Sequence, residues 1–209
     1  MKSFNLQVIL DRGILKDKDM SGAASKIIDG GASLLQLRDK ISNDRELLKE
    51  AKVLRRLTKD KGCKLIINDR VDIAIASSSD GVHLGQDDIP YSEARRLLGK
   101  EGIIGISTHT IEEARAAEKA GADYIGVGPI FATSTKPNHR PIGLEIISKI
   151  AQEIRIPVFF IGGIDLTNIE DVIRSGGKAF AVASAILKSG NITETTKSFI
   201  ETICKAVAV

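Results

Sequence analysis

Short apolar runs alternate with longer amphipathic stretches along the whole chain, and this alternation constrains the fold more than any other feature. Most of the runs are continuous rather than alternating in polarity, which is typical of parallel strands buried on both faces. We therefore expect eight parallel strands, at Leu6–Leu10, Leu34–Leu37, Leu65–Ile67, Gly81–Leu84, Ile103–Ile106, Tyr124–Val127, Val158–Ile161 and Ala179–Val182.

The stretches between these runs have the pattern of helices. Asp44–Lys61 repeats apolar residues at helical spacing, and Thr110–Ala120 begins with a residue suited to cap a helix. Glycines such as Gly121 follow the helical stretches and lead directly into the next strand. The strand–helix unit between Leu65 and Gly81 is the shortest and leaves room for only one or two turns of helix, so the prediction of eight units depends most on it.

Eight strand–helix units of about 25 residues each fill the chain and leave no room for a second domain. We expect residues 1–209 to form a single-domain (β/α)8 TIM barrel of the α/β class, with a doubly wound open sheet as the alternative. The longest segment without an expected element is Gly128–Gly143, and a loop of that length in a compact domain is usually functional.

The composition excludes several classes of protein. The net charge of +3 and the aromatic content of 4% do not support a nucleic-acid-binding surface. No apolar run is long enough to cross a membrane and no signal peptide is visible, so a cytoplasmic protein that binds neither nucleic acid nor membrane is expected. Cys63 and Cys204 are expected to be reduced and buried. Whether the protein forms a homo-oligomer stays open.

Polar residues gather where the expected strands end. In a parallel barrel these ends meet at one rim, which is where barrel enzymes place their active sites. Arg38 and Lys40 follow the second strand and Lys136 lies in the long loop, and such cations together suit a phosphate or diphosphate group. Any one of them alone would more often be a solvated surface charge.

Asp69 and Asp88 follow two neighbouring strands. Two carboxylates beside a cationic pocket fit Mg²⁺, which takes one or two carboxylates together with water and substrate phosphates. The competing interpretation is that each aspartate caps the helix that follows, above all Asp88 before Ile89-Pro90. The sequence has no Cys/His cluster of the kind that binds zinc.

A phosphate-binding position is expected after the seventh and eighth strands, where barrels commonly bind phosphate through backbone N–H groups. The residues there are Gly162, Gly163, Ala183 and Ser184. The loop Thr133–Lys136 offers three hydroxyl groups and a cation, which suits closure over an oxyanion. The alternative interpretation is that Thr133–Lys136 is a polar loop without a function.

Ser107 and the three histidines are the remaining polar candidates. Ser107 is either a substrate contact or a cap for the next helix. His83 is expected to be structural, His109 is the histidine that could face the site, and His139 is expected to be solvated. No Ser–His–Asp arrangement supports nucleophilic catalysis.

The ordered set of strand-end motifs resembles the thiamine phosphate synthase (thiamine-phosphate pyrophosphorylase) family. The matching segments run from the second strand to the eighth: Gln36–Lys40, Ile67–Arg70, Asp80–Asp88, Gly105–His109, Gly121–Phe131, Thr133–Lys136, Gly143–Glu145 and Ile161–Ile164. The resemblance implies a transferase of thiamine biosynthesis that joins 4-amino-2-methyl-5-hydroxymethylpyrimidine diphosphate to a thiazole phosphate and releases diphosphate. The reaction it implies is Mg²⁺-assisted and dissociative, so that diphosphate leaves before the thiazole nitrogen attacks.

The resemblance also assigns roles to residues. It implies pyrimidine diphosphate contacts at Gln36, Leu37, Arg38, Asp39, Lys40, Asn68, Ser107 and Lys136. It implies Mg²⁺ ligands at Asp69 and Asp88, and thiazole phosphate contacts at Thr133, Ser134, Thr135, Gly163, Ala183 and Ser184. Arg38, Lys40 and Lys136 are the expected catalytic residues. One departure is Ala132, which stands where the family usually has proline.

Three other functions compete with this one. A thiazole tautomerase of the same superfamily would use His109 but would need neither the diphosphate cations nor the carboxylates. A sugar-phosphate isomerase would share the phosphate position after the last two strands but would need an acid–base pair. A sensor that kept the pocket would bind ligand without forming product.

Overall fold

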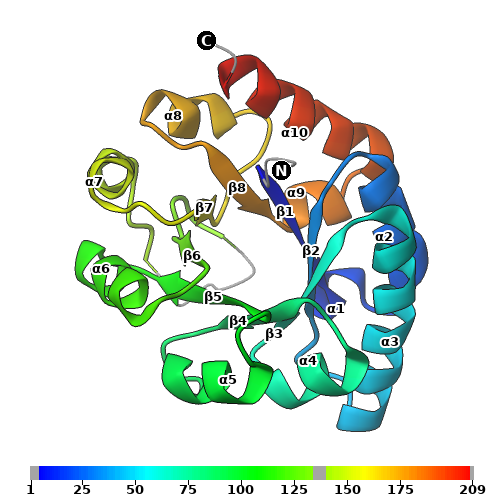
Figure 1. Ribbon diagram of the computed structural model, residues 1–209. Helices are drawn as coiled ribbons and strands as arrows, with labels where there is room; N and C mark the ends of the chain where they lie inside the picture. Colours follow the sequence, from blue (N-terminus) through cyan, green and yellow to red (C-terminus); the bar gives the residue numbers. More distant parts are fainter. Residues whose placement is uncertain (1–4, 134–139, 208–209) are drawn as a thin grey trace.

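The barrel is closed by hydrogen bonds between its first and last strands. The structure, a computed structural model, describes residues 5–133 and 140–207. Its eight parallel strands are ordered β1-β2-β3-β4-β5-β6-β7-β8 and β1 pairs with β8, with helices around the outside (Figure 1). The expected single-domain TIM barrel is confirmed. The alternative of an open sheet is wrong, because Leu6, Gln7 and Val8 pair with Phe180, Ala181 and Val182.

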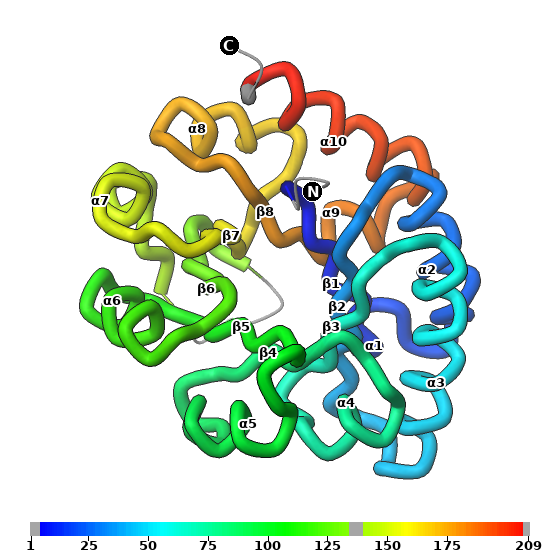
Figure 2. The backbone as a smooth tube through the Cα atoms, viewed as in Figure 1, coloured from blue at the N-terminus to red at the C-terminus, as the bar shows by residue number. Residues whose placement is uncertain are grey.

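The elements follow one another as the sequence pattern indicates (Figure 2). The strands are β1 (Leu6–Asp11), β2 (Leu34–Arg38), β3 (Lys64–Asn68), β4 (Gly81–Leu84), β5 (Ile103–Thr108), β6 (Tyr124–Val127), β7 (Val158–Ile161) and β8 (Ala179–Val182). The helices are α1 (Arg12–Leu15), α2 (Met20–Asp29), α3 (Asp44–Lys61), α4 (Val71–Ser77), α5 (Tyr91–Leu98), α6 (Ile111–Ala120), α7 (Glu145–Glu153), α8 (Ile169–Arg174), α9 (Ser184–Leu187) and α10 (Ile192–Val207).

Several strands extend beyond the apolar runs that predicted them. β1, β2, β3 and β5 each continue for one or two further residues, whereas β4, β6, β7 and β8 have the predicted bounds. The extension of β1 and β2 pairs Asp11 with Arg38. Because strand pairing uses the backbone, a polar side chain does not end the ladder. The extra residues bring charged groups into the barrel rim at fixed positions.

Local capping sets the limits of the two helices that the sequence predicted. α3 spans the expected Asp44–Lys61, with the Asn43 side chain accepting from Glu46 N and Gly62 in the left-handed conformation after its end. α6 spans Ile111–Ala120, and Thr110 caps it as expected, with its side chain accepting from Glu113 N. Within the described residues, no helix is both long and apolar enough to span a membrane.

Two apolar clusters build the protein, one between barrel and helices and one inside the barrel. The inner cluster comes from alternate strand residues, namely Ile9, Leu34, Ile66, Tyr124, Phe159 and Ala181. The Tyr124 ring meets Phe159 edge to face, with centroids 5.3 Å apart. Cys63 is buried as expected, and burial raises the pKa of its thiol to about 12, whereas Cys204 is exposed and the expectation of its burial was wrong.

Gly105 leaves the space that the Tyr124 ring occupies. A Cβ atom at position 105 would lie 2.1 Å from Cζ of Tyr124, so any larger residue would displace the ring. We expect Gly105→Ala to lower the free energy of unfolding by about 3 kcal/mol, the upper end of the usual cost of overpacking. Urea denaturation measures this change.

Gly190→Ala is the matched control, because a Cβ atom at Gly190 would meet nothing within 4 Å. Equal stability of the two variants would contradict the close packing described for the barrel interior.

Candidate active site

A pocket opens at the mouth of the barrel, at the carboxyl ends of the strands. It gathers residues from all eight strands and from several of the segments that follow them. Of the residues singled out from the sequence, it is lined by Gln36, Arg38, Asn68, Ser107, Thr133, Gly163, Ala183 and Ser184. Residues far apart in the chain are therefore brought to one space, as the strand-end argument predicted.

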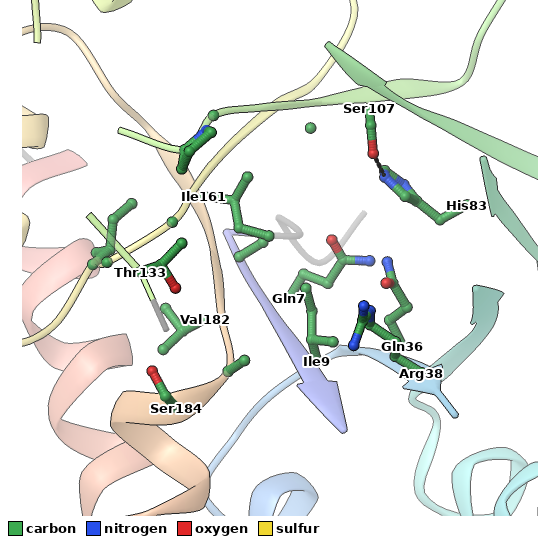
Figure 3. Close-up of a pocket in the computed structure, with 18 of the residues that line it drawn as sticks. Gln7, Ile9, Gln36, Arg38, His83, Ser107, Thr133, Ile161, Val182 and Ser184 are labelled. Carbon is green, nitrogen blue, oxygen red and sulfur yellow. Dashed lines mark hydrogen bonds between the residues drawn. The ribbon is translucent and has the colours of Figure 1, made fainter. Parts of the chain in front are cut away.

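The pocket has two chemically different sides (Figure 3). Gln36, Arg38 and Ser107 supply amide, guanidinium and hydroxyl groups on one side. On the other, Thr133 and Ser184 lie among glycines and small or aliphatic residues of β7, β8 and the segments after them. The two sides suit two different ligands that meet in the middle of the pocket.

Arg38 is held at the pocket wall by a buried carboxylate. Its Nη1 donates to Oδ2 of Asp11 at 2.5 Å, and Oδ1 of Asp11 accepts from Ile14 N at 3.1 Å. Asp11 is only 2% exposed. A carboxylate bonded through both oxygens has little freedom, so it fixes the guanidinium in a position to bind an anion. Sequence reasoning did not single out Asp11, although its place opposite Arg38 follows from the strand register.

Leu37 and Asp39 do not reach the pocket with their side chains. Leu37 points into the core and is 1% exposed. The Asp39 side chain is also 1% exposed, lies 3.5 Å from Nε of Arg12, and accepts from the N–H groups of Ile41 and Ser42. Burial acts to raise the pKa of Asp39, but these hydrogen bonds outweigh it and hold the pKa below its usual range. Asp39 therefore fixes the turn after β2.

Lys40, Asp69 and Asp88 form a charged cluster at the rim. Nζ of Lys40 is paired with Oδ2 of Asp69, and Asp88 lies beside Asp69. Burial raises the pKa of Asp88; a hydrogen bond from Gly85 N, at 2.6 Å, opposes the rise, and the neighbouring Asp69 carboxylate adds to it. Among the described residues the lysine paired with these two carboxylates is Lys40, and one ammonium group leaves negative charge that a cation would neutralise.

Neither aspartate caps the helix that follows it. α4 is preceded by Arg70 and α5 by Pro90, and neither helix has a side-chain cap. Asp69 instead adopts φ +63°, a left-handed conformation that aspartate tolerates better than most residues. The donor set fits Mg²⁺, because two carboxylates satisfy the protein's share of its ligands. The described residues hold no cluster of three or more His, Cys, Asp or Glu side chains.

Tight backbone packing shapes the opposite side of the pocket. Gly162 and Gly163 have φ of +96° and +67°, and a Cβ atom on Gly163 would lie 2.5 Å from the carbonyl oxygen of Ala132. Phe131 N donates to Gly162 O at 3.0 Å, so the start of the long loop is bonded to the end of β7. Glycine is required here both by conformation and by space.

Histidine and glutamine side chains inside the barrel also line the pocket. His83 was expected to be structural, but its Nε2 lies 2.9 Å from Oγ of Ser107 at the pocket wall. Gln7, which the sequence argument missed, bonds to Tyr124 deeper in the barrel. His109 faces the pocket, with Nδ1 2.5 Å from the carbonyl oxygen of Gly128. The sequence signal that could have identified Gln7 and His83 as pocket residues is a polar residue at an inward-facing position of an otherwise apolar strand.

The remaining predicted site residues, Ser134, Thr135 and Lys136, lie outside the described residues, as does His139. Their assignments stay predictions from the sequence.

Comparison with known proteins identifies close relatives. Residues 6–186 match the family described as Thiamine monophosphate synthase. A thiamine-phosphate synthase of Halalkalibacterium halodurans is 46% identical over 200 residues, covering 95% of each chain. That of Clostridium acetobutylicum is 41% identical over 202 residues, covering 97% of this chain and 96% of the relative.

Solved structures agree with the sequence comparison. A thiamine phosphate pyrophosphorylase from Pyrococcus furiosus superposes with a TM-score of 0.89 at 36% identity, covering 98% of this chain and 97% of that one. A 3-hexulose-6-phosphate synthase from Salmonella typhimurium, at 14% identity and a TM-score of 0.71, shares the fold alone.

The carboxylate pair predicts a stabilising effect of Mg²⁺. A raised pKa means that the folded state disfavours the charged form of Asp88, so this part of the stability is lost as pH rises through the raised value. At neutral pH a bound cation would restore it. We expect Mg²⁺ to raise Tm of the wild type by roughly 2–4 °C, the shift that about 1 kcal/mol causes in a domain of this size.

Asp88→Asn should abolish this shift, and thermal melts with and without Mg²⁺ measure it. Asp87→Asn is the matched control, because Asp87 is the exposed neighbour in the chain. Equal Mg²⁺ shifts in the two variants would remove Asp88 from the cation site.

Proposed function

Because the chain belongs to the thiamine monophosphate synthase family, we propose that its barrel pocket is where a pyrimidine diphosphate and a thiazole phosphate are joined. The protein is a thiamine-phosphate synthase, a transferase of thiamine biosynthesis that condenses these two substrates. The observation that carries the assignment of the pocket is its division into a cationic, amide-lined side and a glycine-lined side. Two phosphorylated substrates need two such sites facing each other.

The side formed by β2 to β5 suits the pyrimidine diphosphate. Arg38, held by Asp11, and Lys40, at the rim, offer positive charge for the diphosphate. Gln36, Asn68 and Ser107 line the same pocket and offer hydrogen bonds to the ring. Lys136 is assigned to the same diphosphate from the sequence. Each well-aimed donor to the charge that develops on a leaving group is worth about 3–4 kcal/mol.

The reaction needs no proton transfer to or from the protein in its bond-making steps. The C–O bond between the pyrimidine methylene group and the diphosphate breaks, and the electron pair leaves with the diphosphate. The lone pair of the thiazole nitrogen then forms the new C–N bond. The protein's contribution is to stabilise the leaving group, to hold the nucleophile in place and to exclude water. This chemistry does not require a general base.

Asp69 and Asp88 are the residues that would hold Mg²⁺, since they combine adjacent carboxylates with a raised pKa at Asp88. When bound, the ion would neutralise part of the charge on the diphosphate. Lys40 pairs with Asp69 at the same place. Its ammonium group therefore lies where it can contact both the carboxylate and the diphosphate.

The side formed by β7 and β8 suits the thiazole phosphate. Gly163 allows a close approach of the backbone, and Ala183 and Ser184 stand at the start of α9. Backbone N–H groups in such positions bind phosphate, and hydroxyl groups from Thr133, Ser134 and Thr135 would add to them. Anchoring the phosphate here would aim the thiazole nitrogen at the reacting carbon across the pocket.

The tautomerase alternative has one observation in its favour, which is that His109 lines the pocket. It leaves the Asp11–Arg38 pair and the Asp69–Asp88 pair without a role, because a thiazole phosphate alone brings no diphosphate. The relatives reported above bear the name of the synthase or of the pyrophosphorylase. The synthase is therefore the better account of the pocket.

Arg38→Ala tests the diphosphate side. We expect turnover to fall by about two to three orders of magnitude, as for loss of one strong donor to the transition state. The assay mixes the protein with the pyrimidine diphosphate, the thiazole phosphate and Mg²⁺ and measures diphosphate and thiamine phosphate together, with an EDTA control that should abolish both. Lys136→Ala should behave in the same way.

Arg115→Ala is the matched control, because Arg115 pairs with Glu153 on the outer helices, away from the pocket. Wild-type turnover in Arg38→Ala would refute the proposed diphosphate site. Diphosphate release that persists in EDTA would refute the role of the metal.

A further inference from the structure

A chain of hydrogen bonds inside the barrel leads from Gln7 to the pocket wall at Ser107. Tyr124 Oη accepts from Gln7 Nε2 at 3.2 Å and lies 3.0 Å from Nδ1 of His83. Nε2 of His83 lies 2.9 Å from Oγ of Ser107, the contact drawn in Figure 3. Apart from Ser107, all of these residues are buried. Buried polar groups that are fully bonded are rigid, because each lost bond is costly.

The hydrogen bonds that the phenol oxygen of Tyr124 accepts determine to which group its own O–H donates. Burial raises the pKa of Tyr124, and the neighbouring amide groups of Gln7 and Gln36 both oppose that rise, as N–H donors do. Figure 3 shows the amide nitrogens of Gln7 and Gln36 turned toward each other. The phenol oxygen accepts from Gln7 Nε2, so its own O–H is left to donate, and Nδ1 of His83 is the acceptor beside it.

The direction in which the Tyr124 O–H points determines which nitrogen of His83 carries a hydrogen. If Nδ1 accepts from the phenol, the neutral imidazole carries its hydrogen on Nε2. Nε2 then donates to Oγ of Ser107. Among the described residues the Ser107 hydroxyl bonds to His83 alone, so its own O–H is free to donate into the pocket.

We propose that Tyr124 and His83 are positioning residues that make Ser107 a hydrogen-bond donor to a ring nitrogen of the pyrimidine substrate. The inference rests on the proposed function for the identity of that substrate. It adds a reason for the specificity of the site: a heteroaromatic ring with an acceptor nitrogen satisfies Ser107, whereas a ring with a C–H at that place leaves the donor unpaired.

The tautomer of His83 tests the proposal directly in the wild-type protein. The ¹⁵N chemical shifts of the imidazole nitrogens, measured at a pH where the ring is neutral, distinguish a protonated from an unprotonated nitrogen. We expect His83 to carry its hydrogen on Nε2, with the signals assigned by their loss in His83→Gln. A hydrogen on Nδ1, or on both nitrogens, would overturn the proposal.

His109 is an internal control for this measurement. Its Nδ1 lies 2.5 Å from the carbonyl oxygen of Gly128, which can only accept, so Nδ1 of His109 must be protonated. The two histidines are thus expected to differ in the state of Nδ1 within one spectrum.

Kinetics test whether the arrangement matters for the substrate. We expect Tyr124→Phe to raise KM for the pyrimidine diphosphate about tenfold, the effect of one hydrogen bond, and to leave KM for the thiazole phosphate unchanged. Ser107→Ala should have a similar effect, and the double variant should be no worse than Ser107→Ala. Additive effects in the double variant would overturn the link between Tyr124 and Ser107.

Tyr91→Phe is the matched control, since Tyr91 is the only other tyrosine and donates to Gly121 O on the outside of the barrel. The failures of the two proposals are distinguishable. Wild-type protein that forms thiamine phosphate but carries the other His83 tautomer refutes this inference and leaves the proposed function intact. Protein that forms no product refutes the proposed function, whatever the tautomer.

Discussion

Closure of eight short parallel strands into a ring is the constraint on which the rest of this structure depends. It turns alternate side chains of every strand into one narrow interior, where their volumes must interlock. Glycine at positions 105 and 126 leaves room for the Tyr124 ring and for His83, which lie against these two positions. The same closure carries the next inward residue of each strand up to the rim. The packed interior therefore forms the floor of the pocket, and the position of each polar group above it is fixed by strand register.

Charge at the rim is arranged so that the cations Arg38 and Lys40 have carboxylate partners from neighbouring strands. Asp11 of β1 holds Arg38 of β2, and Asp69, directly after β3, is paired with Lys40. A buried carboxylate is costly unless it is fully bonded, and Asp11 meets that condition through Arg38 and Ile14 N. This arrangement keeps the guanidinium in place before an anion arrives. Preorganised charge of this kind requires no rearrangement when the leaving group departs.

The sequence predicted well those features that depend on local pattern. The strands, the limits of α3 and the convergence of Asp69 and Asp88 follow from periodicity, capping and the common direction of parallel strands. It predicted poorly those features that depend on which way one side chain turns. Asp39 stands between two cations in the sequence, yet its carboxylate bonds back to its own turn. His83 lies within an apolar run, and only the strand register shows that it faces inward toward Ser107.

The two walls of the pocket also differ in how they would tolerate redesign. On the β8 side the inward residues are Ala181 and Ala183, each in contact with the cavity and neither part of a described polar network. Behind the opposite wall, Tyr124 is bonded to both Gln7 and His83, so a change in any one of the three alters the bonding of the others. If the thiazole phosphate binds on the β8 side, as proposed, single substitutions of these small residues could admit a broader range of thiazole-like acceptors. A different heterocycle at the other wall would require several residues to change together, which makes this half of the enzyme the less evolvable one.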